Sequence, residues 1–239
     1  MNELYHNWFT PYLRSEFEML VFGTSGIPVI LFPTERGRFF EAKDSGMIDS
    51  VKLLLDRSKI KIYCPDSIDD QSWCNNNIPP DERVKKHVVY EKLIIKDVIE
   101  FAQNECNSER VILAGCGLGG YNAFNLTFRH PEYVSHLFCI LANYNIKKYL
   151  IGHYDDNCYF NNPPDYLPGL TEEWFSQNIQ DIHIVLGTHA QDYNFKENLE
   201  MSSLLNEKGV RHWLKVHKQG TGWDLYRRLF AEYLSSLKY

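Results

Sequence analysis

The glycine-rich turn at residues 115–120 (GCGLGG) is the segment whose residue types and spacing point most directly to chemistry. An apolar run at Arg110–Ala114 predicts a buried strand before it, and Tyr121–Leu126 begins a helical pattern after it. A strand, a tight turn and a helix joined by glycines at this spacing are typical of a nucleophile elbow, which holds a serine in a strained backbone conformation. Gly117 occupies the position of that serine, so the turn offers no nucleophilic side chain.

The elements that must position this turn follow from the hydrophobic pattern. Short apolar runs predict buried strands at Pro28–Pro33, Ile60–Cys64, Arg110–Ala114, His136–Ala142, Ile182–Gly187 and His212–His217. The clearest helical pattern runs from Asp81 to Glu105, and the opening segment Glu3–Gly23 predicts antiparallel strands. Alternation of strand and helix predicts an α/β fold with a mostly parallel central sheet, helices on both faces, and functional loops at the carboxyl ends of the strands.

Length, charge and cysteine usage narrow the class of protein. The 239 residues are expected to form one domain, 1–239, and 25 Lys and Arg against 31 Asp and Glu give a net charge of −6 without a basic stripe for nucleic acid. No apolar run approaches the roughly 20 residues of a membrane span, so a cytoplasmic protein is expected. The six cysteines lack CxxC spacing, and we predict neither a metal site nor a cofactor.

Several short motifs in the same order along the chain carry a resemblance to a known family. They are Phe32-Pro33-Thr34 with Gly37-Arg38-Phe39, Asp66-Ser67 with Ser72-Trp73, Tyr90-Glu91, the glycine turn with Arg129-His130-Pro131, and Tyr154-Asp155-Asp156 with Tyr159 to Pro163. With these motifs, the chain from about Tyr5 to Tyr233 resembles the esterase family of α/β hydrolases that includes feruloyl esterases, S-formylglutathione hydrolase and mycolyltransferases. The resemblance implies the α/β-hydrolase fold and a serine, histidine and acid site.

The resemblance also assigns the three catalytic positions. It places the nucleophile at Gly117, the acid at Asp192 in GTHAQD (187–192), and the histidine at Trp223 in GTGWD (220–224). A serine hydrolase needs a hydroxyl to attack and an imidazole to accept its proton, and neither glycine nor tryptophan supplies these groups. We therefore interpret the chain as a pseudo-esterase, with Gly117 at positive φ and with Asp192 and Trp223 facing one cleft.

A ligand site is expected to remain where the reaction is lost. In this fold the backbone N–H after the nucleophile, here Leu118, and another from an earlier loop, here near Thr34 or Glu35, form an oxyanion site. These donors, with Trp223 as a pocket wall, predict a site for a small carboxylate or carbonyl ligand or for a protein partner.

Two other functions compete with this interpretation. One is an ester hydrolase or acyltransferase in which Cys116 or a water is the nucleophile and His189 or Asp192 is the base. We expect Cys116 to pack inward and His189 to be solvated or structurally bonded, which disfavours that chemistry. The other is a structural subunit, for example of a homo-oligomer, in which the aromatic-rich loop 154–170 is an interface instead of a pocket rim or lid.

Three charged residues beside the expected oxyanion loop have two possible roles. Glu35, Arg36 and Arg38 either grip a charged ligand or form a solvated face, and the sequence favours neither.

Overall fold

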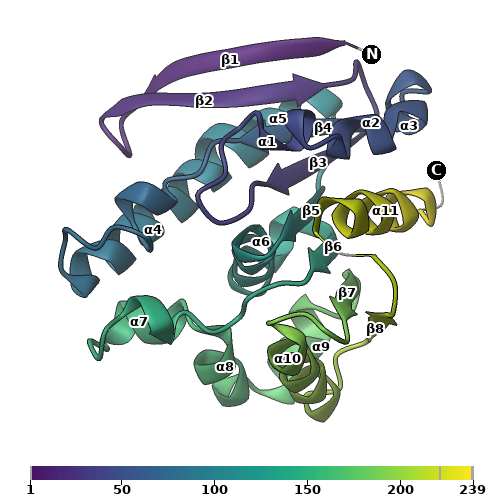
Figure 1. Ribbon diagram of the computed structural model, residues 1–239. Coiled ribbons are helices and arrows are strands. Elements are labelled where there is room, and N and C mark those ends of the chain that lie inside the picture. Colours follow the sequence, from purple (N-terminus) through teal and green to yellow (C-terminus); the bar gives the residue numbers. More distant parts are fainter. Residues whose placement is uncertain (1, 221, 238–239) are drawn as a thin grey trace.

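One eight-stranded sheet runs through the molecule in the order β1-β2-β4-β3-β5-β6-β7-β8 (Figure 1). The computed structural model describes residues 2–220 and 222–237, so Thr221 of the GTGWD segment and the terminal residues Met1, Lys238 and Tyr239 lie outside the described residues. The strands are β1 (Glu3–Thr10), β2 (Ser15–Phe22), β3 (Ile27–Phe32), β4 (Ile60–Pro65), β5 (Val111–Cys116), β6 (Val134–Ile140), β7 (His183–His189) and β8 (His212–His217).

Strand directions agree with the sequence-based expectation. The pairs β1–β2 and β2–β4 are antiparallel, and every pair from β4 through β3, β5, β6 and β7 to β8 is parallel. The six apolar runs all form strands, with ends that differ by at most two residues, because strands covered on both faces are apolar almost throughout. No helix in the described part of the chain is both long and apolar enough to cross a membrane.

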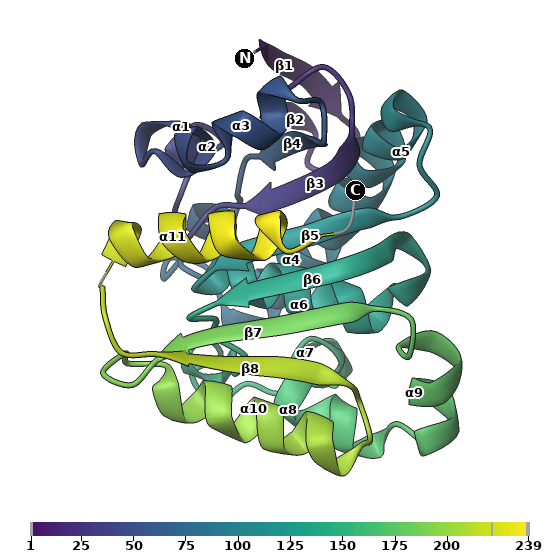
Figure 2. The same ribbon diagram turned by 90° about the vertical axis from the view of Figure 1, so that its right-hand side faces the viewer.

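Helices cover both faces of the sheet (Figure 2). One face is covered by α1 (Glu41–Asp44), α2 (Met47–Ser50), α3 (Lys52–Asp56) and α11 (Gly222–Ser235), and the other by α4 (Pro80–Leu93), α5 (Glu100–Cys106), α6 (Leu118–Arg129), α9 (Glu172–Asn178) and α10 (Phe195–Glu207). Two large apolar clusters, one on each face, form the core. The predicted three-layer α/β arrangement is confirmed.

The predicted helix over 81–105 is a single helical run with a change of winding. The α-helix α4 begins with Pro80 at its first position, where a missing N–H costs nothing, and passes into the π-helical segment η2 (Ile94–Ile99) before α5. Along this run Val84, Ile95, Val98 and Ile99 are buried, and Val88 is half-buried.

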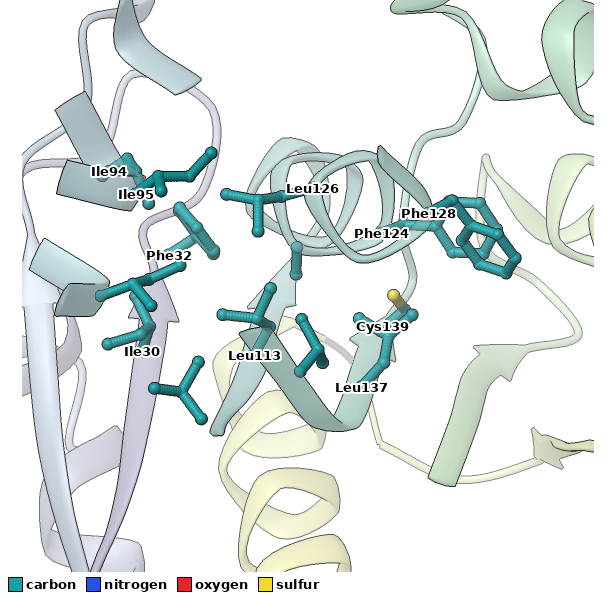
Figure 3. Packing of buried hydrophobic residues seen from close by; sticks show 14 of the residues in the cluster. Ile30, Phe32, Ile94, Ile95, Leu113, Phe124, Leu126, Phe128, Leu137 and Cys139 are labelled. Atoms are coloured by element: carbon teal, nitrogen blue, oxygen red, sulfur yellow. The ribbon is translucent and has the colours of Figure 1, made fainter. Parts of the chain in front are cut away.

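The helix after the glycine turn, α6, is packed on the sheet along its length (Figure 3). Phe124 stacks on Phe128 with ring centroids 4.5 Å apart, and Leu126 lies on the side of the helix that faces Phe32. Leu113 on β5 lies beneath the helix in the same cluster. Burial of this kind fixes the direction in which α6 leaves the turn.

The segment 154–170 is more regular than the sequence indicated. It contains the short helices α7 (Asp156–Phe160), α8 (Pro163–Tyr166) and η5 (Leu167–Gly169). The expectation of an irregular loop is wrong because Asp155 caps α7 by accepting the Cys158 N–H at 2.9 Å and because Pro163 begins α8 at a position that tolerates proline.

Candidate functional site

The backbone of a nucleophile elbow is present between β5 and α6. Gly117 has φ 56° and ψ −119° and precedes the first residue of α6, so the predicted positive φ is observed. A methyl group on Gly115 would clash with the Gly119 backbone, and one on Gly119 would clash with Pro33 O. Gly120 is also closely packed, since a Cβ there would lie 2.6 Å from the Ala142 Cβ. These three glycines allow β5, α6 and the loop after β3 to meet closely.

Space around Gly117 is different from the space around its neighbours. A Cβ on Gly117 would meet only Asn143 Oδ1, at 3.9 Å. Packing therefore leaves room for a side chain at the nucleophile position, and only the positive φ favours glycine there.

A chain of amide groups leads from the elbow to Asp192. Gly117 O accepts the Asn143 N–H at 3.1 Å, Asn143 Nδ2 donates to Asn194 Oδ1 at 3.1 Å, and the Asn194 N–H donates to Asp192 Oδ1 at 2.8 Å. Asp192 thus lies in the turn before α10, where its carboxylate bonds the local backbone. The elbow and the acid position are joined through two asparagines.

Trp223 is the second residue of α11 and lies on the side of the sheet that carries α1–α3. It is half-buried against the cluster that contains Cys116, and its ring meets Tyr226 edge-on with centroids 5.4 Å apart. Burial raises the pKa of Tyr226, and the nearby Cys116, Asp192 and Glu41 raise it further. The pKa of Tyr226 is therefore sensitive both to Cys116 at the end of β5 and to Asp192.

The expected oxyanion loop is held by an internal carboxylate. The Thr34 N–H donates to Glu41 Oε2 at 2.8 Å and the Thr34 hydroxyl to Glu41 Oε1 at 2.6 Å. Glu35 is bound from the other side, because the Tyr149 hydroxyl donates to its Oε2 at 2.8 Å and the Cys74 thiol to its Oε1 at 3.6 Å. That Thr34 donates to a ligand stays a prediction. It would require the Glu41 carboxylate to give up its hydrogen bond with the Thr34 N–H.

The second expected donor, the Leu118 N–H, differs from the Thr34 N–H in its hydrogen bonding. The Leu118 N–H, at the first position of α6, makes no hydrogen bond to any residue in 2–220 or 222–237. Its side chain belongs to an apolar cluster beside the elbow, formed by Trp73, Cys74, Val84, Leu118, Tyr121, Ile146, Tyr149, Leu150 and Cys158. The cluster comes from five separate parts of the chain, around residues 73–74, 84, 118–121, 146–150 and 158, which sequence spacing alone cannot bring together.

The two arginines beside the loop are already paired. Arg38 Nε lies 2.8 Å from Asp66 Oδ1 and Arg38 Nη2 lies 2.7 Å from a Glu18 carboxylate oxygen. Arg36 Nη1 lies 3.3 Å from Asp70 Oδ1. Both arginine side chains are about half exposed in these pairs, which favours the solvated-face interpretation over a grip on a charged ligand.

The alternative catalytic residues are placed in the core. Cys116 is 3% exposed, and burial raises the pKa of its thiol well above the ordinary value. His189 is 5% exposed at the end of β7, and its Nδ1 accepts the Gln191 N–H at 3.2 Å. A protonated, enclosed thiol is a poor nucleophile, and His189 has a local structural bond.

Three ionisable side chains near the loop were not singled out from the sequence. They are Glu41, Tyr226 and the buried Asp69, whose Oδ2 accepts the Arg36 N–H at 3.0 Å. Burial raises the pKa of Asp69 to about 7, and the nearby Glu35 adds to that increase. Tyr226 follows Trp223 by three residues on one helix, a spacing that places both on the same face and was a usable signal. Glu41 and Asp69 had no comparable signal.

The larger hollows of the surface lie away from the elbow. One of about 660 Å³ is lined by residues of β6, β7 and β8 and by Ser236 and Leu237, which follow α11. One of about 600 Å³ is lined by residues 180–183, 206 and 209–213. Neither includes Gly117, Asp192 or Trp223. The half-buried Gly117 is therefore not part of the floor of either hollow.

Sheet order, elbow geometry and layering define an α/β-hydrolase fold. The chain resembles solved structures of a ferulic acid esterase (TM-score 0.78, 14% identity, covering 98% of this chain and 95% of that one) and an S-formylglutathione hydrolase from Staphylococcus aureus (0.76, 10%, 98% and 97%). It also resembles MPT51 from Mycobacterium tuberculosis (0.69, 10%, 97% and 97%). No family model and no curated protein sequence matches the chain. At these identities the likeness establishes the fold, and the neighbours are esterase-family α/β hydrolases.

Proposed function

We propose that this protein is a pseudo-esterase that binds a small ligand or a protein partner at the former active site without hydrolysing it. The observation that carries the proposal is Gly117, which keeps the elbow conformation and has room for a side chain but presents none. Trp223 at the histidine position supplies no basic nitrogen, so the proton acceptor is missing as well.

The positions of the alternative residues support the same proposal. Cys116 packs among core side chains with its thiol pKa raised by burial, and His189 uses Nδ1 for a backbone bond. Asp192 binds the Asn194 N–H within its own turn. A thiol-dependent hydrolase would need Cys116 to leave the core, which makes non-standard ester hydrolysis the weaker function.

The chemistry around the elbow indicates the kind of ligand. The Leu118 N–H points from the start of α6, where the partial positive charge of the helix end favours a carboxylate or carbonyl oxygen. Glu41 now holds the second donor, Thr34, so a ligand carboxylate would have to replace the Glu41 carboxylate there. We therefore expect ligand binding to be stronger in Glu41→Ala than in the unchanged protein.

The test of this function is a comparison of labelling and turnover. We expect no reaction with a fluorophosphonate probe and, with activated aryl esters, at most the roughly 10³–10⁴-fold acceleration over water that an oxyanion site alone gives. Gly117→Ser and Trp223→His are each expected to gain little, because the members of a triad act as a unit. Turnover of about 1–10³ per second in the unchanged protein would overturn the proposal, and its loss in Cys116→Ala would identify the thiol as the nucleophile.

Binding has its own measurement. A thermal-shift screen of small carboxylates and carbonyl compounds is expected to find a ligand that raises Tm, with a larger shift in Glu41→Ala. Leu118→Pro, which removes the N–H at a helix position that accepts proline, is expected to reduce the shift while keeping the helix. Equal binding of a ligand to Glu41→Ala and to Leu118→Pro would mean that its site lies elsewhere.

A further inference from the structure

Three side chains with metal-binding atoms meet at the start of α7. His153, Asp155 and Cys158 each offer one atom, and these atoms all lie within 4.8 Å of one another. His153 Nε2 lies 3.3 Å from Asp155 Oδ2. A single ion with bonds of about 2.0–2.3 Å to nitrogen, oxygen and sulfur would fit among atoms at such separations after small side-chain rotations.

Local backbone structure holds the group together. The His153 N–H donates to Leu150 O at 2.9 Å after a turn in which Gly152 has φ 84°. Asp155 caps α7 with Oδ1, which accepts the Cys158 N–H at 2.9 Å, and this bond leaves Oδ2 toward His153. The same cap places Cys158 one helical turn after Asp155, so its side chain lies on the side of the helix that faces the group.

His153 Nε2 is a buried polar atom without a hydrogen-bond partner among the described residues. His153 Nε2 is inaccessible to solvent and makes no hydrogen bond within the described residues, because its contact with Asp155 Oδ2 has ion-pair distance without hydrogen-bond alignment. A buried polar atom without a partner is costly, and a metal ion would satisfy this nitrogen. The Cys158 side chain beside it is fully buried and not part of any disulfide.

We propose that His153, Asp155 and Cys158 form a site for a divalent transition-metal ion of the zinc type, with water as the fourth ligand. A set of one imidazole, one carboxylate and one thiolate suits Zn²⁺ and excludes Mg²⁺ and Ca²⁺, which prefer oxygen ligands only. Binding releases the thiol proton of Cys158 to solvent and forms a bond from sulfur to the metal. The absence of CxxC spacing had argued against such a site, but the pattern here is HxDxxC.

The site would stabilise the apolar cluster beside the elbow. Cys158 packs in the same cluster as Leu118 and Tyr149, and the Tyr121 hydroxyl of α6 donates to Asn161 O at 2.7 Å, just after α7. An ion that joins residues 153, 155 and 158 would therefore fix the segment that packs against α6 beside the elbow. This inference is independent of the proposed function, since it holds for a catalytic or a non-catalytic elbow.

Cobalt provides a direct reading of the ligands. Chelator-treated full-length protein titrated with Co²⁺ is expected to bind one ion per chain with thiolate-to-cobalt charge-transfer absorption and the visible bands of tetrahedral cobalt, both displaced by Zn²⁺. Cys158→Ser should abolish the charge-transfer absorption, and His153→Gln should weaken binding by more than about tenfold, because even outer-shell changes cost about 10–100-fold. Cys106→Ser is the matched control, because it removes a half-buried thiol beside Tyr63 that is not one of the three proposed ligands. It should bind Co²⁺ as the unchanged protein does.

His153→Gln keeps the test valid even where Cys158→Ser fails to fold, because His153 lies in a partly exposed loop. Zn²⁺ should raise the Tm of the unchanged protein and of Cys106→Ser, and not of His153→Gln. Absence of charge-transfer absorption in the unchanged protein would overturn the proposal. So would its persistence in Cys158→Ser or equal Co²⁺ affinity in His153→Gln.

Discussion

The two ends of α6 differ in what holds them. At the amino end, Gly117 and the close-packed glycines keep a backbone shape, and no side chain at the nucleophile position takes part. At the carboxyl end, Arg129 binds Glu91 of α4 through Nε at 2.8 Å and Nη2 at 3.0 Å, and His130 Nε2 lies 3.1 Å from the same carboxylate. Arg129 Nη1 also donates to Phe160 O at 2.7 Å.

The two ends show that the contacts which stabilise the fold are separate from the position that could carry a reactive group. The carboxyl end joins α6, α4 and α7 through charged side chains that are largely withdrawn from water, so each group depends on its partners. The amino end depends on small residues and backbone contacts, which persist whether or not a nucleophile is present. The glycine turn can therefore keep its geometry without a side chain at residue 117, whereas the network at the other end cannot lose a member without cost to stability.

The largest effect is expected from the charged end. Glu91→Ala should lower the free energy of unfolding by about 3–5 kcal/mol, because it leaves the Arg129 charge half-buried without its bidentate partner. Urea unfolding followed by circular dichroism measures the change. Glu132→Ala is the control, since Glu132 is exposed and lies 3.8 Å from His130. A loss below about 1 kcal/mol for Glu91→Ala would show that the network carries no more than a surface ion pair does.

The same region should make stability depend on pH. Burial lowers the pKa of His87 to about 4, while Glu91 opposes and Arg129 reinforces the decrease. In the unfolded chain His87 takes up a proton near its ordinary pKa, so the unfolded state binds more protons below about pH 6.5 and stability falls as pH falls from about 6.5 to about 4. The loss is on the order of 3 kcal/mol.

Unfolding measured at about pH 7 and about pH 5 tests this dependence. Burial also lowers the pKa of His136 to about 4 and lowers that of His217, whereas the raised pKa of Asp69 acts in the opposite direction. The unchanged protein therefore contains several contributions, and the difference from His87→Gln isolates one of them. Equal pH slopes in the protein and in His87→Gln would contradict the assignment.

A smaller effect is expected from the packed glycines of the amino end. Gly119→Ala should destabilise the protein by about 1–3 kcal/mol, because its new methyl group would meet Pro33 O and lie 2.7 Å from Phe32 O, and backbone atoms yield little. Differential scanning calorimetry measures the decrease. An unchanged Tm would mean that α6 and the loop after β3 are less closely held than the structure indicates.

The smallest effect is expected at the nucleophile position. Gly117→Ala should cost about 1–2 kcal/mol, toward the low end for a side chain in a sparsely populated backbone conformation (φ 56°, ψ −119°), because the new Cβ meets only Asn143 Oδ1 at 3.9 Å. The same calorimetry applies, with Gly119→Ala as the comparison. A larger loss for Gly117→Ala than for Gly119→Ala would reverse the distinction between an open nucleophile position and its packed neighbours.

Much of the architecture could be predicted from local pattern. Apolar runs such as Arg110–Ala114 become strands because a chain covered on both faces has no polar alternation, and glycine spacing at 115–120 specifies the turn. The helix near 81–105 was predicted, but its π-helical segment was not, because packing against the sheet decides the winding there. The helices of 154–170 were not predicted, because the composition of this segment is typical of a loop. The Asp155 side chain nevertheless caps α7 and stabilises it.

The sequence by itself determined which chemical groups are present: Gly117 has no hydroxyl and Trp223 has no basic nitrogen, whatever the fold. Only the tertiary structure decided which groups meet. It brought Glu41 to the Thr34 donors, joined Asp192 to the elbow through Asn143 and Asn194, and enclosed Cys116 in the core. Composition is a property of each residue, but hydrogen bonding and burial depend on residues far apart in the chain, so they follow from the packing of elements and not from spacing.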